Sequence, residues 1–313
     1  MKKIMILILA LNQILALTAC SHKHNYVIDD EVKPTCIDEG RSAGAHCSSC
    51  GEVLIEQSII APKGHNIVGV QCLDCDYKAS EELDYYVDEY KNVIATIGEC
   101  TSENIVVFPC DENGNLIDVF KFYDKNNCKF VKSIVFEEGI ERIVGGVDGC
   151  VNITSVKLPE SLKVLGGGIF FECASLKEIS IPDGVMEIGN FTFYGCKSLE
   201  TLELSRHIQR VGERAFLGCE SLNSISFEEV REINDNAFEG CINLKAINLP
   251  KTLTDIGSKI FYNCPQLEVI NYDCTIEQWN AIRKAEDWHI GLYYPCVIKC
   301  TDGEISMSDI LYG

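Results

Sequence analysis

The sequence has no cluster of basic residues and no second long apolar run. Its 27 lysines and arginines are spread along 313 residues against 47 acidic residues, which gives a formal net charge of −20. Proteins that bind nucleic acids take much of their affinity from clustered Lys and Arg that contact phosphates. The composition therefore excludes a phosphate-tracking nucleic-acid binder. Outside the N-terminus, no stretch is long and apolar enough to cross a bilayer.

Patterns typical of catalysis are also missing. The chain has six histidines, and none stands in the His-Glu-x-x-His arrangement that a hydrolytic zinc site uses. Only His207 falls within the repeats described below, and no Ser-His-Asp or paired-carboxylate set recurs there. We therefore expect that the protein is not an enzyme.

The N-terminus has the pattern of an export signal. Lys2 and Lys3 precede an apolar run over residues 4–19, which is short for a membrane span. Residues 17–20 read Leu-Thr-Ala-Cys and resemble the lipobox of bacterial lipoproteins, which implies cleavage after residue 19 and lipidation of Cys20. The alternative is an ordinary signal peptide. We expect a mature protein held by its lipid on the outer face of a membrane, at the bacterial cell surface.

Residues 20–80 hold four of the six histidines and two Cys-x-x-Cys pairs. The pairs are Cys47 with Cys50 and Cys72 with Cys75, separated by 21 residues. This spacing is close to that of a zinc ribbon, in which two tight turns each present two thiolates to one metal ion. The sequence therefore predicts a structural zinc site. Two local disulfides are the alternative, because exported proteins can form them.

The same segment also resembles a small Cys/His repeat of bacterial surface proteins. Under that resemblance the ligands would be His24, Cys36, Cys47 and Cys50. His65, Cys72 and Cys75 would then begin a truncated second unit. A segment of this kind could also act as a metal sensor or store. Cys47 and Cys50 belong to both ligand sets.

From residue 128 a cysteine recurs in steps of 22, 23, 23, 23, 22 and 23 residues. Most of these cysteines follow a phenylalanine by three residues, and each precedes an apolar residue by three. The strongest units have apolar residues at their first, fourth and sixth positions, which predicts one short strand per unit. The seven cysteines are Cys128, Cys150, Cys173, Cys196, Cys219, Cys241 and Cys264.

A period of this length predicts a solenoid, because a single coil cannot bury its apolar positions and stacked coils can. The motif Leu-x-x-Ile-x-Ile-Pro-x-x-Val-x-x-Ile-Gly-x-x-Ala-Phe-x-x-Cys resembles the BspA-like leucine-rich repeat over about residues 105–272. The expected fold is a leucine-rich repeat solenoid of short parallel strands, turns and short helices, after a small zinc-ribbon-like module. We expect the seven recurring cysteines, called the cysteine ladder below, to be free thiols packed in the core.

The solenoid needs a cap at each end. We predict a signal peptide over residues 1–19, the anchor and Cys/His segment over 20–80, a β cap with a degenerate repeat over 81–128, the solenoid over 129–272 and a C-terminal cap over 273–313. The last contains a helix that begins after Thr275 and a hairpin with an Asp-Gly turn. Cys296 and Cys300 could form a bridge there or pack as core residues.

The exposed positions of the repeat strands form the candidate binding face. They are small and polar, without an aromatic or a charged stripe, which suits weak and extended contact with an extracellular protein or glycan. The resemblance implies a monomeric surface protein that binds or adheres. The alternative is a structural spacer of the envelope without a ligand. The candidate binding residues are Glu178, Ser180, Thr201, Glu203, Ser224, Ser226 and Asn248.

Overall fold

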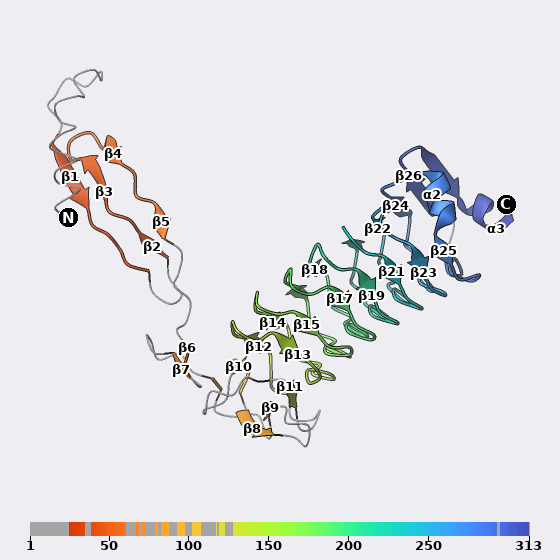
Figure 1. Ribbon diagram of the computed structural model, residues 1–313, viewed down its shortest axis with the longest axis horizontal. Helices are drawn as coiled ribbons and strands as arrows, with labels where there is room; N and C mark the ends of the chain where they lie inside the picture. Colours follow the sequence, from red (N-terminus) through yellow and green to blue (C-terminus); the bar gives the residue numbers. More distant parts are fainter. Residues whose placement is uncertain are drawn as a thin grey trace. The chain divides into compact units, whose positions relative to one another are not determined.

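The computed structural model describes residues 25–34, 39–60, 67–68, 71–72, 79–80, 83–87, 93–97, 102–107, 117, 119–122, 128–292 and 295–312. The chain divides into two compact units: residues 1–66 with 73–75, and residues 67–72 with 76–313 (Figure 1). Within the described ranges, no helix has both the length and the apolar character needed to cross a membrane. The predicted anchor Cys20 lies outside these ranges.

The first unit is a small antiparallel β structure. Strands β1 (Tyr26–Asp29), β3 (Gly44–Cys47) and β4 (Val53–Ile55) form one sheet, and β2 (Gly40–Arg41) pairs with β5 (Ile59–Ile60). Among its described residues, the buried apolar side chains are those of Ala45 and Cys47. The apolar core of this unit is therefore small where it is described.

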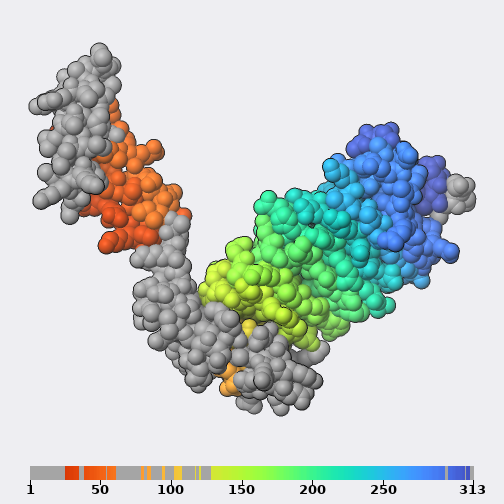
Figure 2. Space-filling model, viewed as in Figure 1, coloured from red at the N-terminus to blue at the C-terminus, as the bar shows by residue number. Residues whose placement is uncertain are grey.

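The second unit confirms the predicted solenoid, with two rows of parallel strands (Figure 1). In the space-filling view, the coils from residue 128 onward lie side by side in sequence order (Figure 2). The first row holds β10 (Asn104–Val107), β12 (Ser133–Phe136), β14 (Ser155–Lys157), β16 (Glu178–Ser180), β18 (Thr201–Glu203), β20 (Ser224–Ser226), β22 (Ala246–Leu249) and β24 (Val269–Tyr272). The second holds β13 (Arg142–Ile143), β15 (Val164–Leu165), β17 (Glu187–Ile188), β19 (Arg210–Val211), β21 (Glu232–Ile233), β23 (Asp255–Ile256) and β25 (Arg283–Lys284).

A column of phenylalanine rings runs through the centre of the coils. Neighbouring ring centroids lie 5.2 to 5.9 Å apart, and each of these rings is fully buried. The rings are nearly parallel, since each coil repeats the geometry of the one before it. The column consists of Phe170, Phe193, Phe216, Phe238 and Phe261.

The cysteines of the ladder pack in the core and also donate hydrogen bonds to the backbone. From Cys173 to Cys264, each Sγ donates a hydrogen bond of 3.0 to 3.2 Å to a backbone carbonyl of the preceding coil. The acceptor is always the residue three positions before the preceding cysteine, for example Phe193 for Cys219. Burial raises the pKa of Cys173 and of Cys264 to about 12. These thiols therefore stay protonated and act as weak hydrogen-bond donors in the core.

The prediction of free thiols along the whole ladder is wrong at its first two positions. Cys128 and Cys150 form a disulfide, with their Cα atoms 5.3 Å apart. Stacked coils place equivalent Cα atoms within the range that a disulfide requires, so the geometry allows this pairing. Cys173 and the four cysteines that follow it keep thiols that bond to the backbone.

Each coil makes two sharp turns beside its cysteine, where the backbone adopts positive φ. The residue just before the cysteine is left-handed in six successive coils, with φ between +57° and +74°. Glycine occupies four of these six positions because it alone adopts this conformation without a steric cost. Glu172 and Asn263 are the exceptions.

The coil between Cys219 and Cys241 is one residue shorter than its neighbours, and the missing residue falls in the turn after the first-row strand. Three residue steps lead from Phe227 to Val230, whereas four lead from Leu204 to Ile208 in the coil before. Strand β20 still pairs in register with β22, Ser224 facing Ala246. The first-row sheet is interrupted between β18 and β20, where the chain enters this coil, whereas the pairing of β20 with β22 and of β21 with β23 is kept.

At the N-terminal end, within the range predicted as a β cap, β8 (Leu83–Val87) and β9 (Val93–Ile97) pair in antiparallel orientation. Strand β11 (Val119–Phe122) adds to β9 in parallel. Strand β10 begins the first row by pairing with β12, as expected for a degenerate first coil.

At the C-terminal end, the predicted capping helix is α2 (Ile276–Ala281), and Thr275 is its N-cap in a capping box with Gln278. It buries Trp279, whose ring lies 5.7 Å from that of Trp288. These are the two tryptophans of the chain, so its tryptophan fluorescence reports on the C-terminal cap.

The predicted hairpin is formed by β26 (Val297–Cys300) and β27 (Gly303–Ser306), followed by α3 (Met307–Tyr312). Its turn residues are Thr301 and Asp302, one position earlier than predicted, because Gly303 pairs with Cys300. Asp302 instead accepts a hydrogen bond from Ile276 N at the start of α2. A bridge between Cys296 and Cys300 is ruled out, since four residues of strand span about 13 Å.

Candidate binding face on the first strand row

The first strand row alternates between buried and exposed side chains, as a strand with one solvated face must. In β16, Ile179 is buried, while Glu178 and Ser180 are exposed. Parallel in-register pairing then places Glu178 next to Thr201 and Ser180 next to Glu203. The predicted binding residues of these two coils therefore share one surface.

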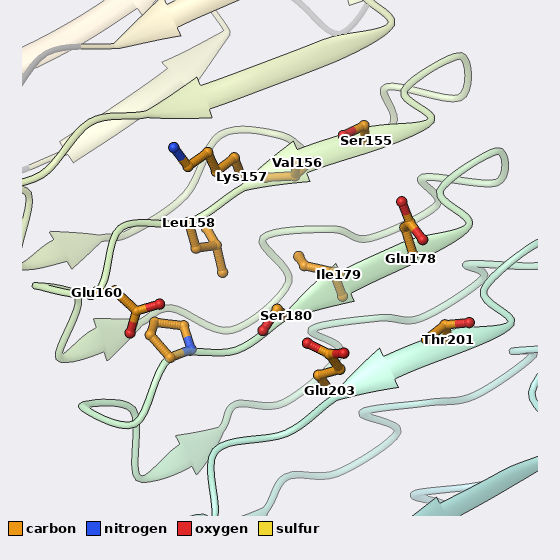
Figure 3. A pocket seen from close by; sticks show the side chains of 11 residues that line it. Ser155, Val156, Lys157, Leu158, Glu160, Glu178, Ile179, Ser180, Thr201 and Glu203 are labelled. Carbon is orange, nitrogen blue, oxygen red and sulfur yellow. The ribbon is translucent and has the colours of Figure 1, made fainter. Parts of the chain in front are cut away.

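That surface is hollowed at β14, β16 and β18, with a volume of about 370 Å³ (Figure 3). All four predicted binding residues of β16 and β18 line this first hollow. Lys157 and Glu160 complete its charged lining, and Figure 3 shows their side chains on the same face as Glu178 and Glu203. The apolar part of the floor comes from Val156, Leu158, Ile179 and Pro182.

A second hollow of about 330 Å³ lies over β18, β20 and β22. It contains the remaining predicted binding residues, Ser224, Ser226 and Asn248. Its charged residues, Arg206 and Glu228, come from the turns after the strands and were not predicted. The strand pattern could not identify them because it covers strand positions alone.

The first hollow gathers several charged side chains in one place. Some charges of neighbouring coils are paired, as Lys163 Nζ is with Glu141 Oε1 at 2.7 Å. Among the described residues, no ion pair or side-chain hydrogen bond engages the charged groups of Lys157, Glu160, Glu178 and Glu203. Three carboxylates and one ammonium therefore face the first hollow, a formal charge of −3 + 1 = −2.

The second hollow is closer to neutral and its arginine is engaged. Arg206 Nη2 lies 2.9 Å from Asp183 Oδ2, and this hydrogen bond holds the pKa of the Asp183 carboxyl below its usual value. Both groups are exposed, so the pair contributes little to stability. The first hollow is therefore the stronger candidate for charge-dependent binding.

The candidate zinc residues are only partly placed. Cys47 ends β3, and Cys50 lies in the turn that leads to β4. Gly51 N donates to Cys47 O at 2.9 Å, and Gly51 has a φ of +74°. This tight turn fits one half of a tetrahedral zinc site.

Cys72 ends the short strand β7 (Gln71–Cys72), which pairs with β6 (Ile67–Val68). The other candidates, His24, Cys36, His65 and Cys75, lie outside the described residues. Where side chains are described, no three His, Cys, Asp or Glu side chains converge as a metal site.

Comparison with known proteins agrees with the fold. Residues 147–268 match the BspA type leucine rich repeat region in six copies. This part of the chain is similar to that family, in agreement with its fold, a leucine-rich repeat solenoid. No protein with a curated function matches the chain.

Solved structures include similar solenoids. A leucine-rich repeat protein of T. pallidum is 23% identical over 60% of this chain and 89% of its own, with a TM-score of 0.50. One from Bacteroides ovatus is 21% identical, over 58% of this chain and 65% of its own, with a TM-score of 0.37. A leucine rich cell surface protein from Faecalibacterium prausnitzii is 16% identical, over 65% and 96%, with a TM-score of 0.31. At this level of identity the T. pallidum structure supports the fold alone.

Proposed function

We propose that the protein is a non-catalytic surface lipoprotein whose solenoid binds an extracellular protein or glycan through the first strand row. Leucine-rich repeat arrays commonly use an extended strand surface for binding. The observation that carries the proposal is the first hollow, because it gathers four charged side chains that no ion pair or side-chain hydrogen bond engages among the described residues. A partner with cationic or hydrogen-bond donor groups would complement it.

Cys20 would hold the protein on the outer face of the membrane through its lipid, and the solenoid would then be presented to the surroundings. Several acyl chains on one residue give durable anchoring, whereas one gives marginal binding. The net negative charge of the chain makes electrostatic attraction to anionic lipid an unsuitable anchor.

Reversing two charges of the first hollow tests the binding proposal. A partner captured by unbiased pull-down with residues 21–313 should bind the Glu178→Lys/Glu203→Lys variant at least about tenfold more weakly, a loss of about 1.4 kcal/mol. The difference in affinity between the variant and the wild type should become smaller as the salt concentration rises. Binding can be measured by surface plasmon resonance.

The matched control is Glu277→Lys/Glu286→Lys, which makes the same charge change at exposed cap residues away from both hollows. Equal weakening by the two variants would indicate a non-specific charge effect and contradict the assignment of the site. A pull-down without any saturable partner would favour the structural spacer instead.

We also propose a structural zinc ion in the Cys/His segment, with Cys47 and Cys50 supplying two thiolates. Cys72 and Cys75 would complete the set, or His24 and Cys36 in the alternative set, with His65 in a second unit. The bound ion would hold the small β module together. Such a site is filled by protein ligands and leaves no position for a reacting water.

Metal analysis tests this proposal. The mature protein, kept reduced, should contain about one zinc ion per chain, and Cys47→Ser/Cys50→Ser should lose it. Cys173→Ser serves as the control, because this thiol is buried in the solenoid and should not affect zinc content. A metal-free protein with these cysteines in disulfides would support the alternative.

A further inference from the structure

Three cysteines lie in the C-terminal cap, and they differ in accessibility. Cys296 is 1% exposed, and burial raises its pKa to about 11. Cys274 and Cys300 are only half-buried and pack against the edge of the core. Reagents in solution can therefore reach Cys274 and Cys300 more readily than Cys296.

The backbone brings Cys274 beside Cys300. Strands β24 and β26 are parallel, with Asn271 facing Lys299. Beyond this pair the chain bends, and the Cys274 carbonyl accepts a hydrogen bond of 2.8 Å from Thr301 N. This contact places the peptide units of Cys274 and Cys300 side by side, and a disulfide requires such proximity, with α-carbons roughly 4.4 to 6.8 Å apart.

The side chains of the two cysteines also share one environment. Cys274 Sγ hydrogen-bonds Gln278 Oε1 on α2. Burial and the nearby charges of Asp302 and of Cys274 raise the pKa of Cys300. A thiol with a raised pKa is less often a thiolate, so Cys300 suits the role of the second thiol to react.

We propose that Cys274 and Cys300 form a redox-active dithiol that closes to a disulfide across the C-terminal cap. The oxidant is a low-molecular-weight disulfide. The Cys274 thiolate attacks one of its sulfur atoms, forms a mixed disulfide and releases one thiolate. The Cys300 thiolate then attacks Cys274 Sγ and releases the second thiolate. The two protein thiols are oxidised, their two protons pass to the released thiolates, and the oxidant is reduced to two thiols.

The bridge would tie the residue before the N-cap of α2 to the end of β26. It would close a loop of 300 − 274 + 1 = 27 residues that contains both tryptophans. The disulfide Cys128–Cys150 lies near the N-terminal end of the repeat array. With the proposed bridge, the array would have one disulfide near each end and free thiols between the two.

Peptide mapping tests the pairing. The full protein is treated with oxidised glutathione at pH 8, remaining thiols are blocked with N-ethylmaleimide, and the protein is digested with trypsin. Cleavage should place Cys274 in peptide 260–283, Cys296 in 285–299 and Cys300 in 300–313. We expect peptides 260–283 and 300–313 to be linked, about 2 Da below the sum of their masses, with fragment ions placing the link at Cys274.

Two variants make the outcome decisive. Cys296→Ser should still form the bridge, while Cys300→Ser should keep a glutathione adduct on Cys274. Oxidation should move the urea midpoint of tryptophan fluorescence upward in the wild type and in Cys296→Ser, but not in Cys300→Ser. A link to Cys264 or Cys296, or adducts on both cysteines without a bridge, would overturn the proposal.

Discussion

Replacing Phe216 with alanine should lower the free energy of unfolding of the solenoid by about 3 to 5 kcal/mol. The Phe216 ring is fully buried, and its centroid lies 5.4 Å from that of Phe193 and 5.2 Å from that of Phe238. Removing it leaves a cavity between two coils and removes ring contacts on both sides. In a repeat array each coil touches only its neighbours, so no distant contact compensates.

Urea unfolding followed by far-ultraviolet circular dichroism measures this effect. The matched control is Phe130→Ala, because Phe130 is 49% exposed and should cost no more than about 0.5 kcal/mol. A loss below about 1 kcal/mol in Phe216→Ala would mean that the coils collapse onto the vacated space, against the packing described above.

Removing the disulfide should have the second large effect. The Cys128→Ser/Cys150→Ser variant should be less stable by about 3 kcal/mol, the chain-entropy expectation for a closed loop of this size. The loop holds 150 − 128 + 1 = 23 residues and joins the degenerate first coil to the regular array. The loss should appear at the N-terminal end first, where hydrogen exchange of β10 and β12 can be measured.

Cys173→Ser is the control for this prediction. Its hydroxyl can still donate to Val147 O, as the thiol does at 3.1 Å, so a smaller loss is expected. Reduction of the wild-type protein should reproduce the effect of the double variant. Unchanged stability on reduction would show that the bond does not stabilise the array.

The repeated part of the fold could be predicted because one pattern recurs in each coil. Leu176, Ile179 and Ile181 occupy the first, fourth and sixth positions of their unit, and all three are buried. When coils with such a pattern stack, their buried side chains form columns, whatever the details of each turn. The cap helix could be predicted for a similar reason, since the Thr275 capping box is a local signal.

Other features depend on where backbone atoms lie and could not be predicted. The hydrogen bond from Cys219 to Phe193 O requires the carbonyl of the preceding coil to point at the sulfur atom. The approach of Cys274 to Cys300 follows from a bend after β24, which has no signal in the spacing of these cysteines. The lining of the hollows by Glu160 and Arg206 depends likewise on how the turns fold over the strands.

The short coil between Cys219 and Cys241 shows how this surface can diversify. Loss of a residue between Phe227 and Val230 leaves β20 paired with β22 and β21 paired with β23, so this turn can change length while those pairings are kept. The same set of turns supplies Arg206 and Glu228 to the second hollow. Insertions and deletions there can reshape the surface around the hollows while the coils stay stacked, which makes these turns suitable sites for grafting foreign peptides.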